Sequence, residues 1–250
     1  MSKKNATTQL TENLIYLKLP WTRENFESLA SQAADKSWSH VEFLGRLIEG
    51  ETHLRTERAI ERRIKAARFP VVKTLEQFDW TWAKKINRAK IQNAFRLQFI
   101  EQKSNVIFLG SVGLGKTHLA IALGYQACLE GYRTLFTSAA DIINTLSAAQ
   151  AAHRLKIELK KYLRPALLII DELGFMPIDK HGADLLFQVI SQRYEQGAII
   201  LTTNKPFKTW ASIFNNDSVV TSAILDRLLH HSEAISIQGK SYRMKDRIEP

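Results

Sequence analysis

Near the middle of the chain the sequence reads Gly110-Ser111-Val112-Gly113-Leu114-Gly115-Lys116-Thr117. This segment fits the pattern G-x-x-x-x-G-K-[ST] at every position. Glycines in such a loop let backbone N–H groups converge on phosphates, the lysine reaches the β- and γ-phosphates, and the threonine hydroxyl binds Mg²⁺. We therefore predict a phosphate-binding loop at 110–117, with His118 as a further candidate nucleotide contact.

The sequence on both sides of this loop supports the prediction. Residues 105–109 form a short apolar, β-branched run that indicates a buried strand. Residues 117–130 are rich in Ala and Leu and end before Gly131, which is typical of a helix with a glycine at its C-terminus. The order strand, loop, helix favours a phosphate site over the alternative, a glycine-rich turn that binds nothing, because the helix dipole adds to the anion site.

Composition predicts a globular protein with a polyanionic partner. The chain has 250 residues, 45% of them apolar, and a net charge of +10. Nucleic acid is the first candidate partner and an anionic membrane surface the second, although charge alone does not separate either from a basic protein with no such partner. The polar N-terminus, the absence of a long apolar span and the single cysteine, Cys128, predict a cytoplasmic protein without a membrane segment.

Residues 1–69 carry apolar residues at helical spacing and predict a helical N-terminal module that binds DNA or a partner. We expect helices over 11–19, from Thr22 and from Ser39, which would cap the third. The predicted core stripe of that third helix is Val41, Phe43, Leu44, Leu47 and Ile48. Residues 70–250 would form the nucleotide-binding domain, beginning with a linker and a basic helix over 70–104.

Two basic segments are candidate DNA contacts. The first group is Arg55, Arg58, Arg62 and Arg63, and the second is Arg154, Lys156, Lys160 and Lys161. Leucines spaced four apart in the second segment would be buried and leave the cations at the surface. For the first group, the alternative to DNA contact is a solvated helix face whose arginines form ion pairs with Glu57 and Glu61. Both DNA contact and a solvated face stay open.

The linker at 73–82 contains Phe78, Trp80 and Trp82. Such aromatic residues either contact a nucleotide base or pack the domain against its neighbour, and packing is the favoured interpretation. The basic residues that follow predict a helix over 83–102.

Residues 166–172 read Ala-Leu-Leu-Ile-Ile-Asp-Glu, a buried strand that ends in two carboxylates. Burying carboxylates is costly without a cation or hydrogen bonds, so a functional interpretation is favoured. We expect Asp171 to hold the Mg²⁺ shell and Glu172 to polarise the attacking water.

A further strand over 198–204 ends at Asn204, a candidate sensor of the γ-phosphate or the water. The alternative is a turn asparagine before Lys205-Pro206. Helices over 182–196 and 218–230 and a final strand over 233–237 complete an α/β pattern. The alternation predicts a parallel, doubly wound sheet with the nucleotide at the carboxyl ends of its strands.

Other phosphate-loop classes fit less well. Asp171 and Gly174 satisfy the D-x-x-G pattern of GTPases, but Phe207 stands where the guanine-reading N-K-x-D pattern needs a carboxylate. A small-molecule kinase would not need Glu172 beside Asp171. An ATP-hydrolysing switch is therefore favoured.

Three segments together resemble the IstB family. They are G-S-V-G-L-G-K-T-H-L-A over 110–120, L-L-I-I-D-E-L-G over 167–174 and D-R-L-L-H over 226–230. These are ATP-binding helper proteins of insertion sequences, close to DnaC-type helicase loaders. The similarity covers nearly the whole chain. It implies that residues 70–250 form an AAA+ ATPase domain beside the small helical N-terminal domain.

The resemblance also implies an oligomer on duplex DNA that helps to select the target and stimulates a cognate transposase, with ATP and Mg²⁺ as cofactors. Lys116 and Thr117 would bind phosphate and magnesium, Asp171 and Glu172 would form Walker B, and Asn204 would be sensor 1. Arg227 would be the arginine finger that reaches the γ-phosphate of a neighbouring subunit. A helicase loader and a scaffold with negligible hydrolysis are the alternatives. No role is assigned to Arg243.

Overall fold

The computed structural model describes residues 3–82 and 85–244. Contacts within the chain divide it into two compact units, Met1–Arg62 and Arg63–Pro250. Helix α3 (His40–Ala67) contains the division, a few residues before the boundary expected after residue 69.

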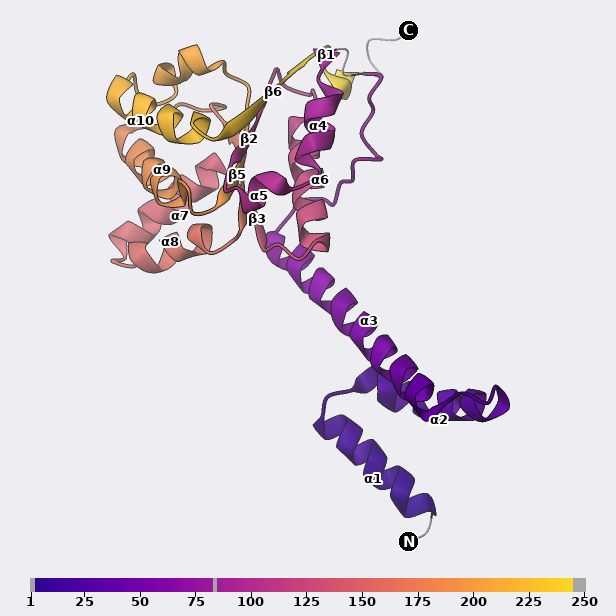
Figure 1. Cartoon of the computed structure of the whole chain (residues 1–250). Helices are drawn as coiled ribbons and strands as arrows, with labels where there is room; N and C mark the ends of the chain where they lie inside the picture. Colours follow the sequence, from indigo (N-terminus) through magenta and orange to yellow (C-terminus); the bar gives the residue numbers. More distant parts are fainter. Residues whose placement is uncertain (1–2, 83–84, 245–250) are drawn as a thin grey trace. The chain divides into compact units, whose positions relative to one another are not determined.

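The first unit is helical, as predicted. It contains α1 (Lys3–Tyr16), α2 (Pro20–Asp35) and most of α3 (Figure 1). The hydroxyl of Ser39 accepts the N–H of Glu42 at 3.1 Å, so the predicted cap of the third helix is confirmed.

A buried carboxylate joins two helices of this unit. Glu51 on α3 accepts the backbone N–H of Thr22 on α2 at 3.1 Å, and its other oxygen lies 3.5 Å from Nε of Arg55. Because Glu51 is only 3% exposed, these contacts offset the cost of burying its charge.

The predicted core stripe of α3 is largely wrong. Leu47 is buried, but Val41, Leu44 and Ile48 are 80%, 57% and 52% exposed. Helix α2 contacts the side of α3 that carries Leu47 and Glu51, which lie one turn apart. Within the described part of the first unit, no element covers the other apolar side.

The second unit is built on a six-stranded sheet in the order β1-β6-β2-β5-β4-β3. The strands are β1 (Lys85–Ile86), β2 (Asn105–Leu109), β3 (Thr134–Ser138), β4 (Leu167–Leu173), β5 (Ala198–Thr203) and β6 (Ser232–Gln238). All neighbouring pairs are parallel except β1 with β6. The predicted parallel sheet is confirmed, with one antiparallel edge strand added.

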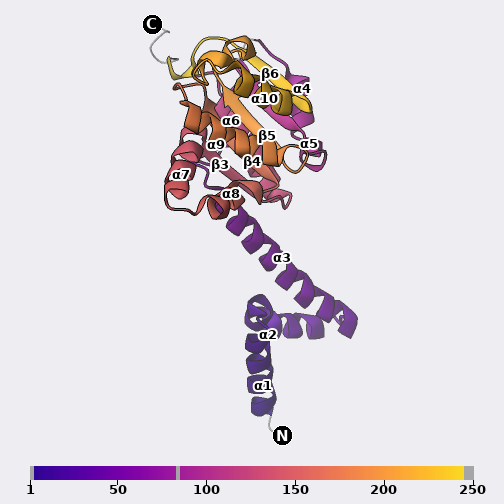
Figure 2. The same ribbon diagram turned by 90° about the vertical axis from the view of Figure 1, so that its left-hand side faces the viewer.

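Helices cover both faces of the sheet (Figure 1). One face packs against α4 (Arg88–Ala94), α5 (Gln98–Glu101) and α6 (Lys116–Leu129). The other face, turned to the viewer in Figure 2, packs against α7 (Ala139–Ala151), α8 (Leu155–Leu163), α9 (Lys180–Arg193) and α10 (Ser218–Leu229). Side chains alternate between the layers, since Ile107 belongs to the second core while Val106 and Phe108 belong to the first.

The predicted helix over 83–102 is wrong. Residues 83–84 lie outside the described residues, and the rest forms β1, α4 and α5. Leu97 separates the two helices in a left-handed conformation (φ 59°), which interrupts any continuous helix. Pairing of Ile86 with Ile237 draws the start of this segment into the sheet. Tertiary pairing thus overrides the local helical pattern.

The single cysteine lies in the core. Cys128 is buried in α6 as predicted, and burial raises the pKa of its thiol. Within residues 3–82 and 85–244, none of the helices combines the length and apolarity needed to cross a bilayer.

Candidate nucleotide-binding site

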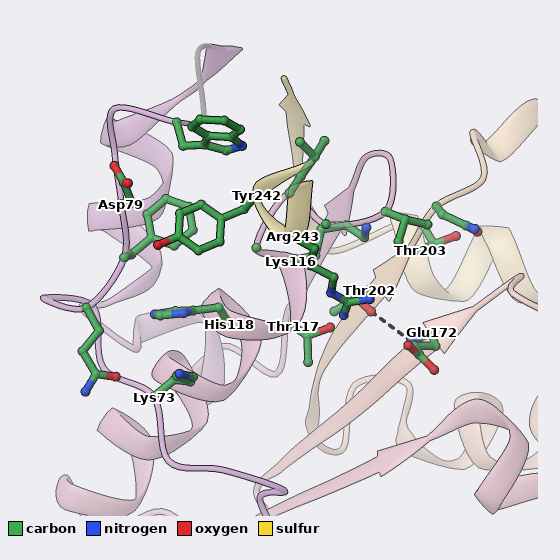
Figure 3. A pocket seen from close by; sticks show the side chains of 18 of the residues that line it. Lys73, Asp79, Lys116, Thr117, His118, Glu172, Thr202, Thr203, Tyr242 and Arg243 are labelled. Carbon is green, nitrogen blue, oxygen red and sulfur yellow. Dashed lines mark hydrogen bonds between the residues drawn. The ribbon is translucent and has the colours of Figure 1, made fainter. Parts of the chain in front are cut away.

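A cavity of about 420 Å³ lies at the carboxyl ends of the parallel strands (Figure 3). Many of the residues singled out from the sequence line it, namely Val112, Gly113, Leu114, Gly115, Lys116, Thr117, His118, Glu172 and Asn204. The carboxyl edge of a parallel sheet is where doubly wound folds bind ligands. The fold therefore gathers segments that are far apart in the sequence at one place.

The loop at 110–115 connects β2 to α6. Gly115 adopts φ +84°, and a side chain there would come within 2.6 Å of the Phe78 ring, so only glycine fits. Lys116 begins α6, and its Nζ donates to the carbonyl of Ser111 at 2.8 Å. Burial lowers the pKa of Lys116, the negative charge of Asp171 opposes that shift, and the positive charge of Arg243 adds to it.

Asp171, near the end of β4, accepts hydrogen bonds from two hydroxyls. Oγ1 of Thr117 donates to Oδ1 of Asp171 at 2.9 Å, and Oγ1 of Thr202 donates to the same oxygen at 2.5 Å. The aspartate is 6% exposed. A carboxylate beside the loop hydroxyl is the oxygen donor set that Mg²⁺ prefers, so these residues fit the metal that the loop pattern implies.

Glu172 follows directly but has a different environment. Its backbone is left-handed (φ 61°), and the pairing of β4 with β5 shifts register between Ile170 and Leu173. Its N–H donates to Oγ1 of Thr202 at 3.0 Å. This conformation is unfavourable for a residue with a Cβ. The irregularity leaves the Glu172 carboxylate exposed at the cavity while Asp171 is buried.

Asn204 immediately follows β5 and lines the same cavity. Its Oδ1 is buried and has no hydrogen-bond partner among the described residues. The turn N–H of Lys205 donates instead to Oγ1 of Thr203 at 3.1 Å. The side-chain oxygen of Asn204 therefore does not cap this turn.

The far end of the cavity is more aromatic. Phe78, Trp82, His118 and Tyr242 line it, and the His118 ring centroid lies 5.5 Å from that of Phe78. Nε2 of His118 is 2.9 Å from the Thr74 carbonyl, which requires that this nitrogen carry the proton. Burial lowers the pKa of His118, so the ring is neutral near pH 7.

Several residues of the cavity were not singled out from the sequence as parts of the site. They are Lys73, Gln77, Asp79, Phe175, Thr202, Thr203, Tyr242 and Arg243. The polar tip Thr202-Thr203 of an apolar strand was a usable signal. The linker and the C-terminal residues carry no local pattern that points to this cavity.

A family model described as IstB-like ATP binding protein matches residues 12–250. The chain belongs to this family. A Pseudomonas aeruginosa protein named for ATP binding and for insertion sequence IS21 is 44% identical over 231 residues, which cover 92% of this chain and 87% of the relative. A Geobacillus stearothermophilus protein, likewise named for ATP binding and for insertion sequence IS5376, is 42% identical, with 92% of each chain covered.

Solved structures show the same fold at lower identity. The DnaC helicase loader superimposes with a TM-score of 0.50 and 23% identity, covering 71% of this chain and 99% of the loader. At this identity the likeness supports the AAA+ P-loop fold and nothing more specific. The sequence-based assignment of the fold class is confirmed.

Arg227, the predicted arginine finger of this IstB-like chain, does not line the cavity. It lies on α10, where its Nη1 donates to the carbonyl of Ala223 at 3.0 Å and its guanidinium lies 4.9 Å from the Phe187 ring centroid. A role at a nucleotide of the same chain is therefore not supported by this geometry.

The candidate DNA contacts all lie outside the cavity, and most are exposed. Arg63 is half-buried and donates from Nε to the Cys128 carbonyl at 2.8 Å, whereas Arg55 donates to the Lys18 carbonyl at 3.0 Å. These two arginines thus make contacts within the fold. Among these candidates, the exposed residues whose side chains form no ion pair or hydrogen bond within the described part of the chain are Arg58, Arg62, Arg154, Lys156 and Lys160.

Proposed function

We propose that this chain is an ATP-hydrolysing regulator of DNA transposition that oligomerises on duplex target DNA and recruits or stimulates a cognate transposase. The observation that carries the proposal is the contact of Thr117 with Asp171, because it joins the phosphate loop to a Walker B carboxylate in a chain of the IstB-like family. Relatives named for insertion sequences support the setting in transposition.

In this proposal each residue of the site has a distinct role in ATP hydrolysis. Lys116 and the loop N–H groups bind the β- and γ-phosphates, while Thr117 and Asp171 hold Mg²⁺. When bound, the metal would neutralise negative charge on the phosphate oxygens. Glu172 orients the attacking water and accepts its proton as the water oxygen bonds to the γ-phosphorus and the bond to the bridging oxygen breaks, giving ADP and phosphate. Asn204 donates from its amide to the γ-phosphate or the water.

Arg227 completes the site from a neighbouring subunit. It is part-buried on α10 and away from the cavity of its own chain. A guanidinium supplied in trans would stabilise the charge on the transferred phosphoryl group and make hydrolysis depend on assembly. We expect Arg227→Ala to bind ATP normally and to release phosphate slowly even on DNA; unchanged turnover would remove this assignment.

DNA binding rests on the net charge of +10 and on the two basic segments. Phosphate contacts of exposed lysines and arginines carry little sequence information, so the oligomer would bind many duplexes.

The proposal is tested by particle mass in solution, with ATP and Mg²⁺, comparing no DNA, duplex and single-stranded DNA of equal length. Large particles that require both ATP and duplex are the expected result, and stimulation of the cognate transposase is then measured on the same assembly. Assembly on single strands alone would favour a helicase loader. A monomer under all conditions would overturn the proposal.

A further inference from the structure

Three potential metal ligands lie together at the end of the sheet opposite the nucleotide cavity. They are Glu195, His230 and His231, and one ligand atom of each lies within 4.8 Å of the others. Glu195 lies shortly before β5, and the two histidines directly precede β6, so all three are at the amino ends of parallel strands. The nucleotide cavity lies at the carboxyl ends, and the cluster is therefore separate from it.

The backbone around this cluster is held by Asn105, which is 7% exposed. The N–H of Asn105 donates to the carbonyl of His231 at 2.7 Å, and its Nδ2 donates to the carbonyl of Leu228 at 3.0 Å. Its Oδ1 accepts the N–H of Ile199 at 3.0 Å. Asn105 thus ties the start of β5 to the turn that carries both histidines. Because this backbone is fixed, only the exposed side chains have to move to surround an ion.

The side chains of the cluster already face one another. The rings of His230 and His231 have centroids 4.1 Å apart, and Nε2 of His231 lies 3.5 Å from Oε1 of Glu195. Nδ1 of His230 lies 2.7 Å from the hydroxyl of Tyr194. A histidine that binds a metal commonly donates its other ring N–H to such a partner, and the Tyr194 hydroxyl can serve this purpose with Nε2 of His230 as the ligand atom.

Two helices end at the cluster and add a field that favours a cation. Helix α9 ends at Arg193 and α10 ends at Leu229, and the two helices pack against each other (Figure 1). Glu195 and His230 therefore lie just beyond two helix C-termini, where the helix dipole is negative. The carboxylate of Glu195 contributes a full negative charge at the same place.

We propose that Glu195, His230 and His231 bind one Zn²⁺ ion, with water as the fourth ligand. Two imidazoles and a carboxylate are a known ligand set for zinc with one open position, whereas Mg²⁺ prefers oxygen ligands. Ligand atoms of a tetrahedral zinc ion lie about 3.3 Å apart, so the side chains need only rotate inward from their observed spacing. Bound zinc would link the end of α9 to the end of α10, the helix that carries Arg227.

The test is isothermal titration of the full-length chain with ZnCl₂, using EDTA-treated protein without a polyhistidine tag and omitting nucleotide and DNA. We expect one Zn²⁺ per chain, and excess Mg²⁺ should not displace it. His231→Ala should weaken binding at least about tenfold, because losing even a partner of a metal ligand has an effect of this size. The matched control is His181→Ala, which removes an exposed histidine at the other end of α9 and should leave the affinity unchanged.

Thermal unfolding gives a second measurement. Zn²⁺ should raise the unfolding temperature of the wild type and of His181→Ala, but not that of the double variant His230→Ala, His231→Ala. The unfolding temperature without metal checks the fold of each variant, and glutamine replaces alanine where a variant unfolds early.

Two results would overturn the inference. One is a wild type that does not bind Zn²⁺, and the other is a double variant that binds it as tightly as His181→Ala does. Since nucleotide and DNA are omitted, either result is independent of the proposed function, which has its own test on DNA.

Discussion

At the scale of single residues, Asp171 and Glu172 are neighbours with opposite environments. Asp171 is buried and accepts two hydroxyl donors, whereas Glu172 is exposed at the cavity in a left-handed backbone conformation. The hydroxyl of Thr202 serves both, because it donates to Asp171 and accepts the N–H of Glu172. One strand irregularity thus gives two adjacent carboxylates different environments, in line with the metal-binding and water-orienting roles that we propose for them.

Glu172→Gln should lower the rate of ATP hydrolysis about a hundredfold or more while leaving ATP affinity nearly unchanged. The amide keeps the size of the side chain but no longer accepts a proton, and general-base contributions are of this order. Phosphate release and nucleotide titration measure the two quantities. Asp184→Asn on the exposed side of α9 is the control. Normal turnover in the Glu172 variant would refute its assigned role.

Thr202→Val should lower the free energy of unfolding by about 1–3 kcal/mol, because the buried Asp171 carboxylate loses one of its two hydroxyl donors and the N–H of Glu172 loses its acceptor. It should also slow hydrolysis, since Asp171 and Glu172 would no longer share a hydroxyl partner. Thr202→Ser keeps the hydroxyl and should preserve both properties. Chemical denaturation and phosphate release are the measurements, and equal behaviour of Val and Ser variants would contradict this account.

At the scale of elements, Arg193 joins α9 to its surroundings. It is 1% exposed, and its guanidinium donates to the carbonyls of Tyr162 (2.8 Å), Pro165 (2.9 Å), Ala166 (3.1 Å) and Ala198 (2.7 Å). Burial lowers the pKa of Arg193 to about 10, so it remains charged at neutral pH. One side chain thereby satisfies carbonyls at the end of α8, before β4 and at the start of β5.

Arg193→Met should lower the free energy of unfolding by about 3 kcal/mol or more, since four backbone carbonyls lose a charged donor and buried acceptors are left unpaired. Arg193→Lys should recover only part of the difference, because an ammonium cannot span the same carbonyls. Urea denaturation monitored by circular dichroism is the measurement. The exposed Arg133→Met is the control and should be nearly neutral.

Elements also show where sequence patterns are reliable. The strands at 105–109, 167–173 and 198–203 were predicted closely because runs of buried apolar residues occur in the middle of the sheet. The helix over 83–102 was not, because Leu97 adopts a left-handed conformation and Ile86 pairs with β6. The apolar side of α3 was predicted to be core, yet packing uses only the side with Leu47 and Glu51.

At the scale of the whole molecule, the net positive charge makes salt the main variable of the proposed DNA binding. Lys156 and Lys160 are exposed on α8, and their side chains form no ion pair or hydrogen bond within residues 3–82 and 85–244. Counterion release makes the logarithm of the affinity of a phosphate-binding protein fall linearly with the logarithm of salt concentration.

Combined Lys156→Ala and Lys160→Ala should weaken binding to all duplex sequences and reduce the salt slope by roughly one for each DNA phosphate that is no longer neutralised. Fluorescence anisotropy with a labelled duplex over a range of NaCl measures this. Lys208→Ala should leave the slope unchanged. A slope unaltered by the double substitution would assign these lysines to a solvated face.

The local pattern of residues determined the phosphate loop, the strand that carries Asp171 and Glu172, and the α/β class. These features depend on residue type and spacing within a short segment, so they can be read without knowing the fold. Tertiary structure alone decided that Thr202 links the two carboxylates, that Arg193 is buried among carbonyls and that Arg243 and Lys116 line one cavity. Such contacts join segments distant in the chain, and their positions follow from strand order and packing rather than from local spacing.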